Sequence, residues 1–330
     1  MSNSAYKAAV LMSVAYLVFV SIFLVSHRSF FSPDQFFVVA ILVTLFLGKF
    51  KQFIRDWSAP IVLLLSYDYL RGLAPKLISQ AHVFPMINFD KAIFGSIPTN
   101  DLQSLLFADK LVHWYDYVAT VFYMSHFIVP MLVGFIFWLT GREIFKDYFL
   151  ALLLLSYAAF FTYVLFPAVP PWMASQYGVI PEVFKIMDKV FLSFPQGIDL
   201  PSVYKFVGAN LVAAVPSLHA AYPFLTLLFF VKRFKSWGLL VFPYVLGVWL
   251  TIVYLGEHYV FDIVVGVLYA SIAYLLVIKK EYFFSLFSIS VKTISNYVGK
   301  PVNQKNGKLA PPCLTVDQQS ESNSPLKPHE

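Results

Sequence analysis

Two short segments of the chain carry residue types that can do chemistry. Residues 216–223 read Pro-Ser-Leu-His-Ala-Ala-Tyr-Pro and include His219, and residues 256–262 read Gly-Glu-His-Tyr-Val-Phe-Asp and include His258 and Asp262. His258 and Asp262 are four residues apart, so on a helix they share one face. The aspartate can then accept the proton of one imidazole nitrogen and leave the other nitrogen aimed at a substrate. With His219 as a proton donor, the set predicts nucleophilic and acid/base chemistry on a phosphate ester.

The same three residues allow two other interpretations. Two histidines and one carboxylate can form a facial triad that binds a metal ion, and polar side chains also hold transmembrane helices together. The catalytic interpretation is favoured because ionisable groups inside membrane segments are costly and usually functional. No acidic cluster supplies further metal ligands. We therefore expect a site that needs no metal and no other cofactor.

Five further residues are candidates for binding the substrate: Asp68, Arg71, His126, Ser217 and Tyr259. Arg71 can clamp a phosphate bidentately, although a local ion pair with Asp68 is the plain alternative. Ser217 lies at a helix start, where backbone amides bind anions readily. His126 lies in the middle of an apolar run, where packing is the alternative role. Tyr259 directly follows His258.

The composition sets the class of protein that must position these residues. Of the 330 residues, 59% are hydrophobic and 13% are charged, whereas a soluble domain carries about 25% charged residues. We therefore expect an all-α, polytopic membrane protein. The net charge of +6 fits basic loops that set membrane topology. Because no basic stripe, zinc-ligand spacing or Gly-rich phosphate loop is present, no nucleic-acid partner is expected. The single cysteine, Cys313, lies in a polar tail and excludes an intrachain disulfide.

Eight apolar runs predict transmembrane helices, since a bilayer core needs about 20 apolar residues per helix. The run at 36–48 is short, and partial insertion is its alternative. The eight runs cover residues 8–25, 36–48, 58–73, 112–139, 148–166, 214–231, 237–255 and 259–278.

Basic residues set the expected topology. They follow the second, fourth, sixth and eighth runs, around residues 49–55, 142–146, 232–235 and 279–280. Short basic loops stay in the cytoplasm, so both termini are expected there. His219 and His258 then lie at the outer ends of the sixth and eighth helices. An even number of crossings brings both to one face, which predicts an active site on the extracytoplasmic or lumenal side.

At this point the residues resemble a known family. Pro216-Ser217-x-His219 and His258-x-x-x-Asp262 are similar to the second and third signature motifs of the type 2 phosphatidic acid phosphatase superfamily. Other blocks resemble its inositol-phosphorylceramide-synthase-like branch, namely Tyr67-Asp68-x-x-Arg71-Gly72, Tyr123-x-Ser125-His126-Phe127, Phe166-Pro167-x-x-Pro170-Pro171-Trp172 and the run 213–223.

The resemblance implies a fold, an activity and residue roles. It implies an α-helical bundle with a six-helix catalytic core, and it assigns His258 as nucleophile, Asp262 as its orienting group and His219 as general acid and base. It implies a phosphotransferase that moves a phosphoinositol-like head group from a phospholipid donor to a lipid alcohol acceptor. The expected organisation is N-terminal transmembrane helices at 1–57, a catalytic membrane domain at 58–280, and an interfacial segment with a disordered cytoplasmic tail at 281–330.

Departures from the family pattern bear on the reaction. Lipid phosphatases carry a Ser-Arg pair shortly before the nucleophile, where this chain has Thr251 and Ile252. Their first motif, a lysine followed by Arg-Pro, has no clear counterpart. The synthase-like branch shares such departures, which favours transfer over hydrolysis. Hydrolysis by a lipid phosphate phosphatase stays an alternative, as does a membrane transporter or lipid-binding protein.

Overall fold

The computed structural model describes residues 33–71, 80–193 and 211–280. Within these ranges the regular structure is helical, apart from two isolated parallel bridges that join Ala168 to His82 and to Ala213. The expected all-α membrane bundle is thus confirmed. The chain divides into two units, residues 1–280 and residues 281–330. The second unit, including Cys313, lies outside the described residues, and so does the expected span at 8–25.

Each expected run within the described ranges forms a helix. The long helices are α2 (Pro33–Phe46), α3 (Phe50–Arg71), α6 (Trp114–Thr140), α7 (Arg142–Leu165), α11 (Leu218–Phe234), α12 (Phe242–Tyr254) and α13 (Val260–Ile278). Between them lie α4 (Phe84–Phe94), α5 (Pro98–Leu106), α8 (Pro171–Gln176), α9 (Ile186–Leu192) and the 3-10 helix η2 (Lys235–Val241). The expected domain boundary at residue 58 lies inside α3 and stays a prediction.

Several of these helices are suited to a bilayer. Three stretches in the described part are long and apolar enough to cross one, Arg142–Leu165, Leu218–Tyr254 and Val260–Ile278, and α6 is a fourth if its two bent halves count together. The stretch Leu218–Tyr254 folds back on itself. The Trp249 indole of α12, near the end of the stretch, donates to the Ala220 carbonyl of α11, near its start, over 3.2 Å. The expected total of eight crossings stays a prediction.

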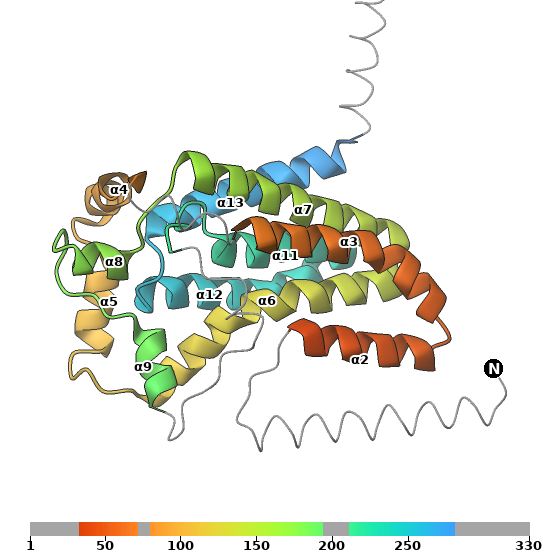
Figure 1. The fold of residues 1–330 in the computed structure, drawn as a ribbon, viewed down its shortest axis with the longest axis horizontal. Helices are drawn as coiled ribbons and strands as arrows, with labels where there is room; N and C mark the ends of the chain where they lie inside the picture. The colour runs from red at the N-terminus through yellow and green to blue at the C-terminus, as the bar shows by residue number, and fades with distance from the viewer. Residues whose placement is uncertain (1–32, 72–79, 194–210, 281–330) are drawn as a thin grey trace, which may run out of the picture. The chain divides into compact units, whose positions relative to one another are not determined.

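Helix α11 lies at the centre of the described bundle. It packs against α6, α7, α12 and α13, and α13 packs in turn against α7. These helices and α3 lie side by side, whereas the short helices α4, α5, α8 and α9 gather at one end (Figure 1). Since α11 and α13 both begin at that end, the expected catalytic residues at their starts are brought under the short helices.

Helix α6 is bent by 51° between Trp114–His126 and Ile128–Thr140. Pro130 lies within the helix, and a proline in a helix cannot donate to the carbonyl four residues earlier, which here belongs to His126. The bend therefore falls beside a histidine that the sequence singled out.

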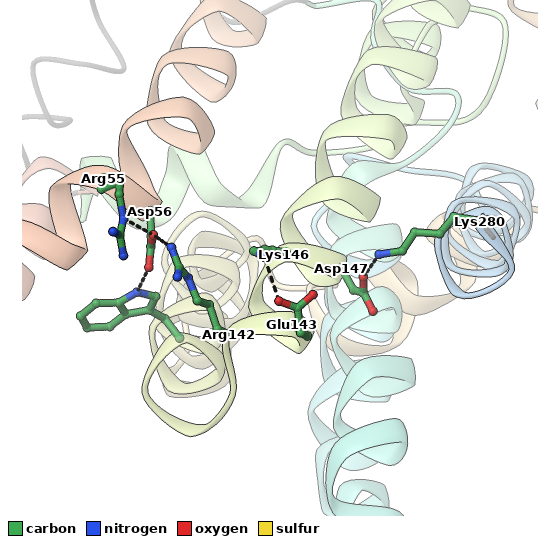
Figure 2. Close-up of polar contacts among 8 residues, drawn as sticks. Arg55, Asp56, Arg142, Glu143, Lys146, Asp147 and Lys280 are labelled. Carbon is green, nitrogen blue, oxygen red and sulfur yellow. Dashed lines mark hydrogen bonds and ion pairs between the residues drawn. The ribbon is translucent and has the colours of Figure 1, made fainter. Parts of the chain in front are cut away.

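Ion pairs join the helices at the opposite end of the bundle. The Asp56 carboxylate of α3 pairs with Arg55 and with Arg142 of α7, and it accepts the Trp138 indole N–H of α6 at 3.1 Å (Figure 2). Asp147 of α7 binds Lys280 at 2.6 Å and Lys232 of α11 at 3.3 Å. The basic clusters that set the expected topology thus lie at one end, and the two candidate catalytic histidines, His219 and His258, lie at the other.

Candidate active site

The backbone just before His219 is fixed by three chain segments. The Ala168 N–H donates to the Val212 carbonyl at 2.8 Å, and the His82 N–H donates to the Pro167 carbonyl at 2.7 Å. The Tyr163 hydroxyl of α7 donates to the Pro216 carbonyl at 2.8 Å. The outer loops therefore hold the start of α11 in place.

Ser217 starts α11 and also ties it to α13. Its hydroxyl accepts the Ala220 N–H at 3.3 Å, which caps the helix. Its own N–H donates to the Asp262 carbonyl at 3.1 Å. A side chain at Gly266 of α13 would lie 2.5 Å from the Ser217 carbonyl oxygen. This close approach is possible only because residue 266 has no Cβ, and it fixes the separation of the two helices.

Asp262, His258 and His219 form a continuous chain of contacts. The Asp262 Oδ2 lies 3.1 Å from the His258 Nδ1 and also accepts the Tyr259 N–H at 2.9 Å. The His258 Nε2 lies 3.2 Å from the His219 Nδ1. Asp262 is fully buried and His258 is 5% exposed. The structure thus brings together the three residues that are the predicted catalytic set, although 39 positions of the chain separate the two histidines.

The contacts also fix where the protons lie. A carboxylate can only accept, so the His258 Nδ1 carries the proton that Asp262 binds. When His258 is neutral, its Nε2 is then an unprotonated acceptor, and the His219 Nδ1 donates to it. This pattern leaves a basic nitrogen on His258 and a proton on His219, which is the arrangement that a nucleophile and a general acid need.

The first N–H groups of helix α13 are bound by a carboxylate that the sequence did not reveal. Asp90 of α4 is fully buried, and its two carboxylate oxygens accept the N–H groups of Val260 and Phe261, each at 3.0 Å. Burial raises the pKa of the Asp90 carboxyl, and the two backbone donors oppose that rise. An anion at a helix N-terminus is favourable, so Asp90 anchors the segment that carries His258. No local pattern could have shown this, because 170 residues separate the partners.

A buried glutamine anchors the loop before His258. The Gln103 side chain of α5 donates to the Tyr254 and Phe184 carbonyls and accepts the Phe184 N–H, all at 2.8 Å. Gly256 follows with a φ of +82° that favours glycine. The Ile252 carbonyl then accepts the N–H groups of Glu257 and His258, both at 3.1 Å. Ile252, which was compared above with the arginine of the lipid phosphatases, therefore supports this loop through its backbone carbonyl.

His126 is a third histidine at the site. Its ring centroid lies 3.7 Å from that of His219, and its Nδ1 donates to the Tyr123 carbonyl at 2.8 Å. The Tyr123 ring stacks on His219 with centroids 4.3 Å apart. Both the packing and the site interpretations of His126 keep support, because the side chain is buried with its Nδ1 satisfied and still touches the expected acid.

The remaining candidates have different places. Tyr259 is fully buried, and its hydroxyl has no hydrogen-bond partner within the described parts of the chain. Asp68 and Arg71 lie on the last turns of α3, but their side chains are outside the described residues. Substrate binding by these residues stays a prediction.

The catalytic and the metal-binding interpretations require different arrangements of the three groups. Asp262 contacts the Nδ1 of His258, whereas His219 faces the Nε2 on the other side of the ring. The three groups do not converge on one point, as a facial triad would. Over residues 33–71, 80–193 and 211–280, no group of three or more His, Cys, Asp or Glu side chains is arranged to hold a metal ion.

Comparisons with known proteins show the family of the chain. The family model described as the PAP2 superfamily matches residues 99–276, which include the three histidines and Asp262. The chain is also 28% identical over 224 residues to the phosphoinositol dihydroceramide synthase of Bacteroides thetaiotaomicron, over 64% of this chain and 72% of that protein. No solved structure matches the chain.

Proposed function

Since the chain belongs to the PAP2 superfamily and is a membrane enzyme of the lipid phosphatase and phosphotransferase type, we propose that it transfers a phosphoinositol-like head group. The donor is an inositol phospholipid and the acceptor is a ceramide-like lipid alcohol. The name of the Bacteroides relative supports this substrate class. The observation that carries the chemistry is the unbroken contact chain from Asp262 through His258 to His219.

In the first half-reaction His258 displaces the lipid part of the donor. The Nε2 lone pair forms a bond to phosphorus while the bond from phosphorus to the diacylglycerol oxygen breaks. His219 gives its proton to that leaving oxygen. Asp262 keeps the Nδ1 proton in place and stabilises the positive charge on the His258 ring. Because Nε2 and the His219 Nδ1 are only 3.2 Å apart, the His219 ring moves aside when phosphate enters between them.

In the second half-reaction the head group passes to the acceptor. The hydroxyl oxygen of the lipid alcohol attacks phosphorus, and His219 now takes the hydroxyl proton. The bond from phosphorus to Nε2 breaks, which restores neutral His258 and protonated His219. Water in place of the alcohol would release inositol phosphate, so the acceptor decides between transfer and hydrolysis of the phosphodiester.

The site is assigned to the extracytoplasmic or lumenal side of the membrane. Basic clusters lie at the end of the bundle that carries Asp56 and Asp147, and short basic segments stay cytoplasmic (Figure 2). His219 and His258 lie at the other ends of α11 and α13. Head groups would therefore be processed in the outer leaflet.

Product analysis of the purified full-length protein tests the proposal. Inositol-labelled phosphatidylinositol is supplied with and without a ceramide-like alcohol, and labelled lipid product should form only with the alcohol. His258→Ala should lose nearly all turnover, and retention of more than about a tenth of it would overturn the nucleophile. Water-soluble inositol phosphate in both arms would show hydrolysis of the phosphodiester instead of transfer. No product in either arm would favour the transport or lipid-binding alternative.

A further inference from the structure

Three residues near His258 take no part in the proposed bond-making steps. They are Glu257, Trp172 at the start of α8, and Lys185 just before α9. Backbone hydrogen bonds hold them together, because the Trp172 N–H donates to the Gly256 carbonyl at 3.1 Å and the Ile186 N–H donates to the Leu255 carbonyl at 3.4 Å. Trp172 thus makes one of these two backbone hydrogen bonds, and Glu257 and Lys185 are each next in sequence to a residue that makes one.

One carboxylate oxygen of Glu257 accepts no hydrogen bond from the described residues. Its Oε1 is buried and has no hydrogen-bond partner within the described parts of the chain. Burial raises the pKa of the Glu257 carboxyl. The charges of Lys185 and His258 and a hydrogen bond from the Trp172 indole oppose that rise, whereas the Asp188 carboxylate adds to it. A buried oxygen with no donor costs free energy unless a ligand satisfies it.

Lys185 places a cation beside the Trp172 indole. Its Nζ lies 5.1 Å from the centroid of the Trp172 ring and 3.5 Å from the Asp188 carboxylate. The ammonium group thus occupies the face of the indole where a cationic ligand would otherwise bind. It also offsets the repulsion between Glu257 and an anionic phosphodiester that approaches His258.

These features select a class of head group. A carboxylate oxygen accepts hydroxyl donors, and two neighbouring hydroxyls can engage both oxygens. The indole offers an apolar surface to the carbon face of a ring. A choline or ethanolamine head group would compete with Lys185 for the same carboxylate and the same aromatic face. The chemistry therefore favours an uncharged polyol over an amine.

We propose that Glu257, Trp172 and Lys185 form the subsite that binds the polyol head group of the donor phospholipid, next to His258. The assignment rests on the proposed function, since it names the part of the chain that recognises the donor. It also accounts for donor choice in a chain whose signature motif lacks the arginine of the phosphatases, because recognition then comes from the head group as well as from the phosphate.

Equilibrium binding tests the subsite apart from turnover. The full-length protein is purified in detergent with His258→Ala in every sample, and dioctanoyl phosphatidylinositol and dioctanoyl phosphatidylethanolamine are titrated. Glu257→Gln keeps the size of the side chain and removes its charge. Affinity for phosphatidylinositol should fall about tenfold to a hundredfold, as expected for lost hydrogen bonds to a charged acceptor, while affinity for phosphatidylethanolamine stays within about threefold. Glu182→Gln is the matched control, because it removes an exposed carboxylate of the same loop that pairs with Lys110 and not with Lys185.

Two further variants keep the result decisive. Trp172→Phe retains an aromatic ring without its N–H, and Lys185→Gln should raise the affinity for phosphatidylethanolamine because the competing cation is gone. Equal losses for both lipids in Glu257→Gln, or no preference for phosphatidylinositol in the parent protein, would overturn the subsite. A retained preference in a protein that forms no transfer product would overturn the proposed reaction and leave the subsite standing.

Discussion

Asp90 should control both the stability and the activity of the protein, although it lies on an outer helix and is not a catalytic residue. Asp90→Ala removes two charge-assisted hydrogen bonds to the first amides of α13. Such bonds are each worth about 1.5–3 kcal/mol. The two amides are partly buried, and water recovers some of the loss, so we expect about 3 kcal/mol. That corresponds to a fall of about 4–5 °C in the melting temperature, because the entropy of unfolding scales with chain length.

The loss should also reach the active site, because the Asp90 carboxylate holds the turn between His258 and Asp262. Misplacement of reacting groups by about 1 Å can cost about a hundredfold in rate. We therefore expect turnover to drop by about that factor at temperatures where Asp90→Ala is still folded. The assay is head-group transfer by purified protein, measured beside thermal unfolding in the same detergent.

A neighbouring carboxylate provides the control. Asp101 is on the adjacent outer helix α5, is exposed, and contacts the hydroxyl of Ser96. Asp101→Asn should change stability by no more than about 0.5 kcal/mol and leave turnover unchanged. Equal melting temperatures for Asp90→Ala and Asp101→Asn would contradict the stabilisation of α13 by Asp90. A destabilised Asp90→Ala protein that turns over at the wild-type rate would contradict the role of Asp90 in positioning the active site.

Three other outcomes are expected. Gly266→Ala puts a Cβ 2.5 Å from the Ser217 carbonyl oxygen at the start of α11, so it should separate the two histidines and lower kcat about a hundredfold. Ser271→Ala on the same helix should leave kcat unchanged, and a fully active Gly266→Ala enzyme would contradict the close approach of α11 and α13. Transfer should persist in strong chelator, and activity that is lost and then restored by a divalent ion would instead support metal chemistry. In a background with Cys313 replaced, an impermeant thiol reagent on sealed right-side-out membranes should label Tyr177→Cys and spare Ser236→Cys, and the reverse pattern would invert the topology.

The sequence by itself determined the class of protein and the identity of the candidate catalytic residues. Long apolar runs predict helices wherever they occur, because a bilayer leaves no other partner for the backbone. The spacing of His258 and Asp262 is local, so one turn of helix fixes their contact before any packing is known. Counting membrane crossings then placed His219 at the same end of the bundle.

Only the tertiary structure decided how these residues meet and what supports them. The 3.2 Å between His258 and His219 depends on the approach of α11 and α13 at Gly266. The anchor at Asp90 joins residues 170 positions apart. Such contacts have no periodicity or spacing in the chain, because they arise where separate helices pack. They require the fold, whereas the helices and the His–Asp pair follow from local sequence and the solvent.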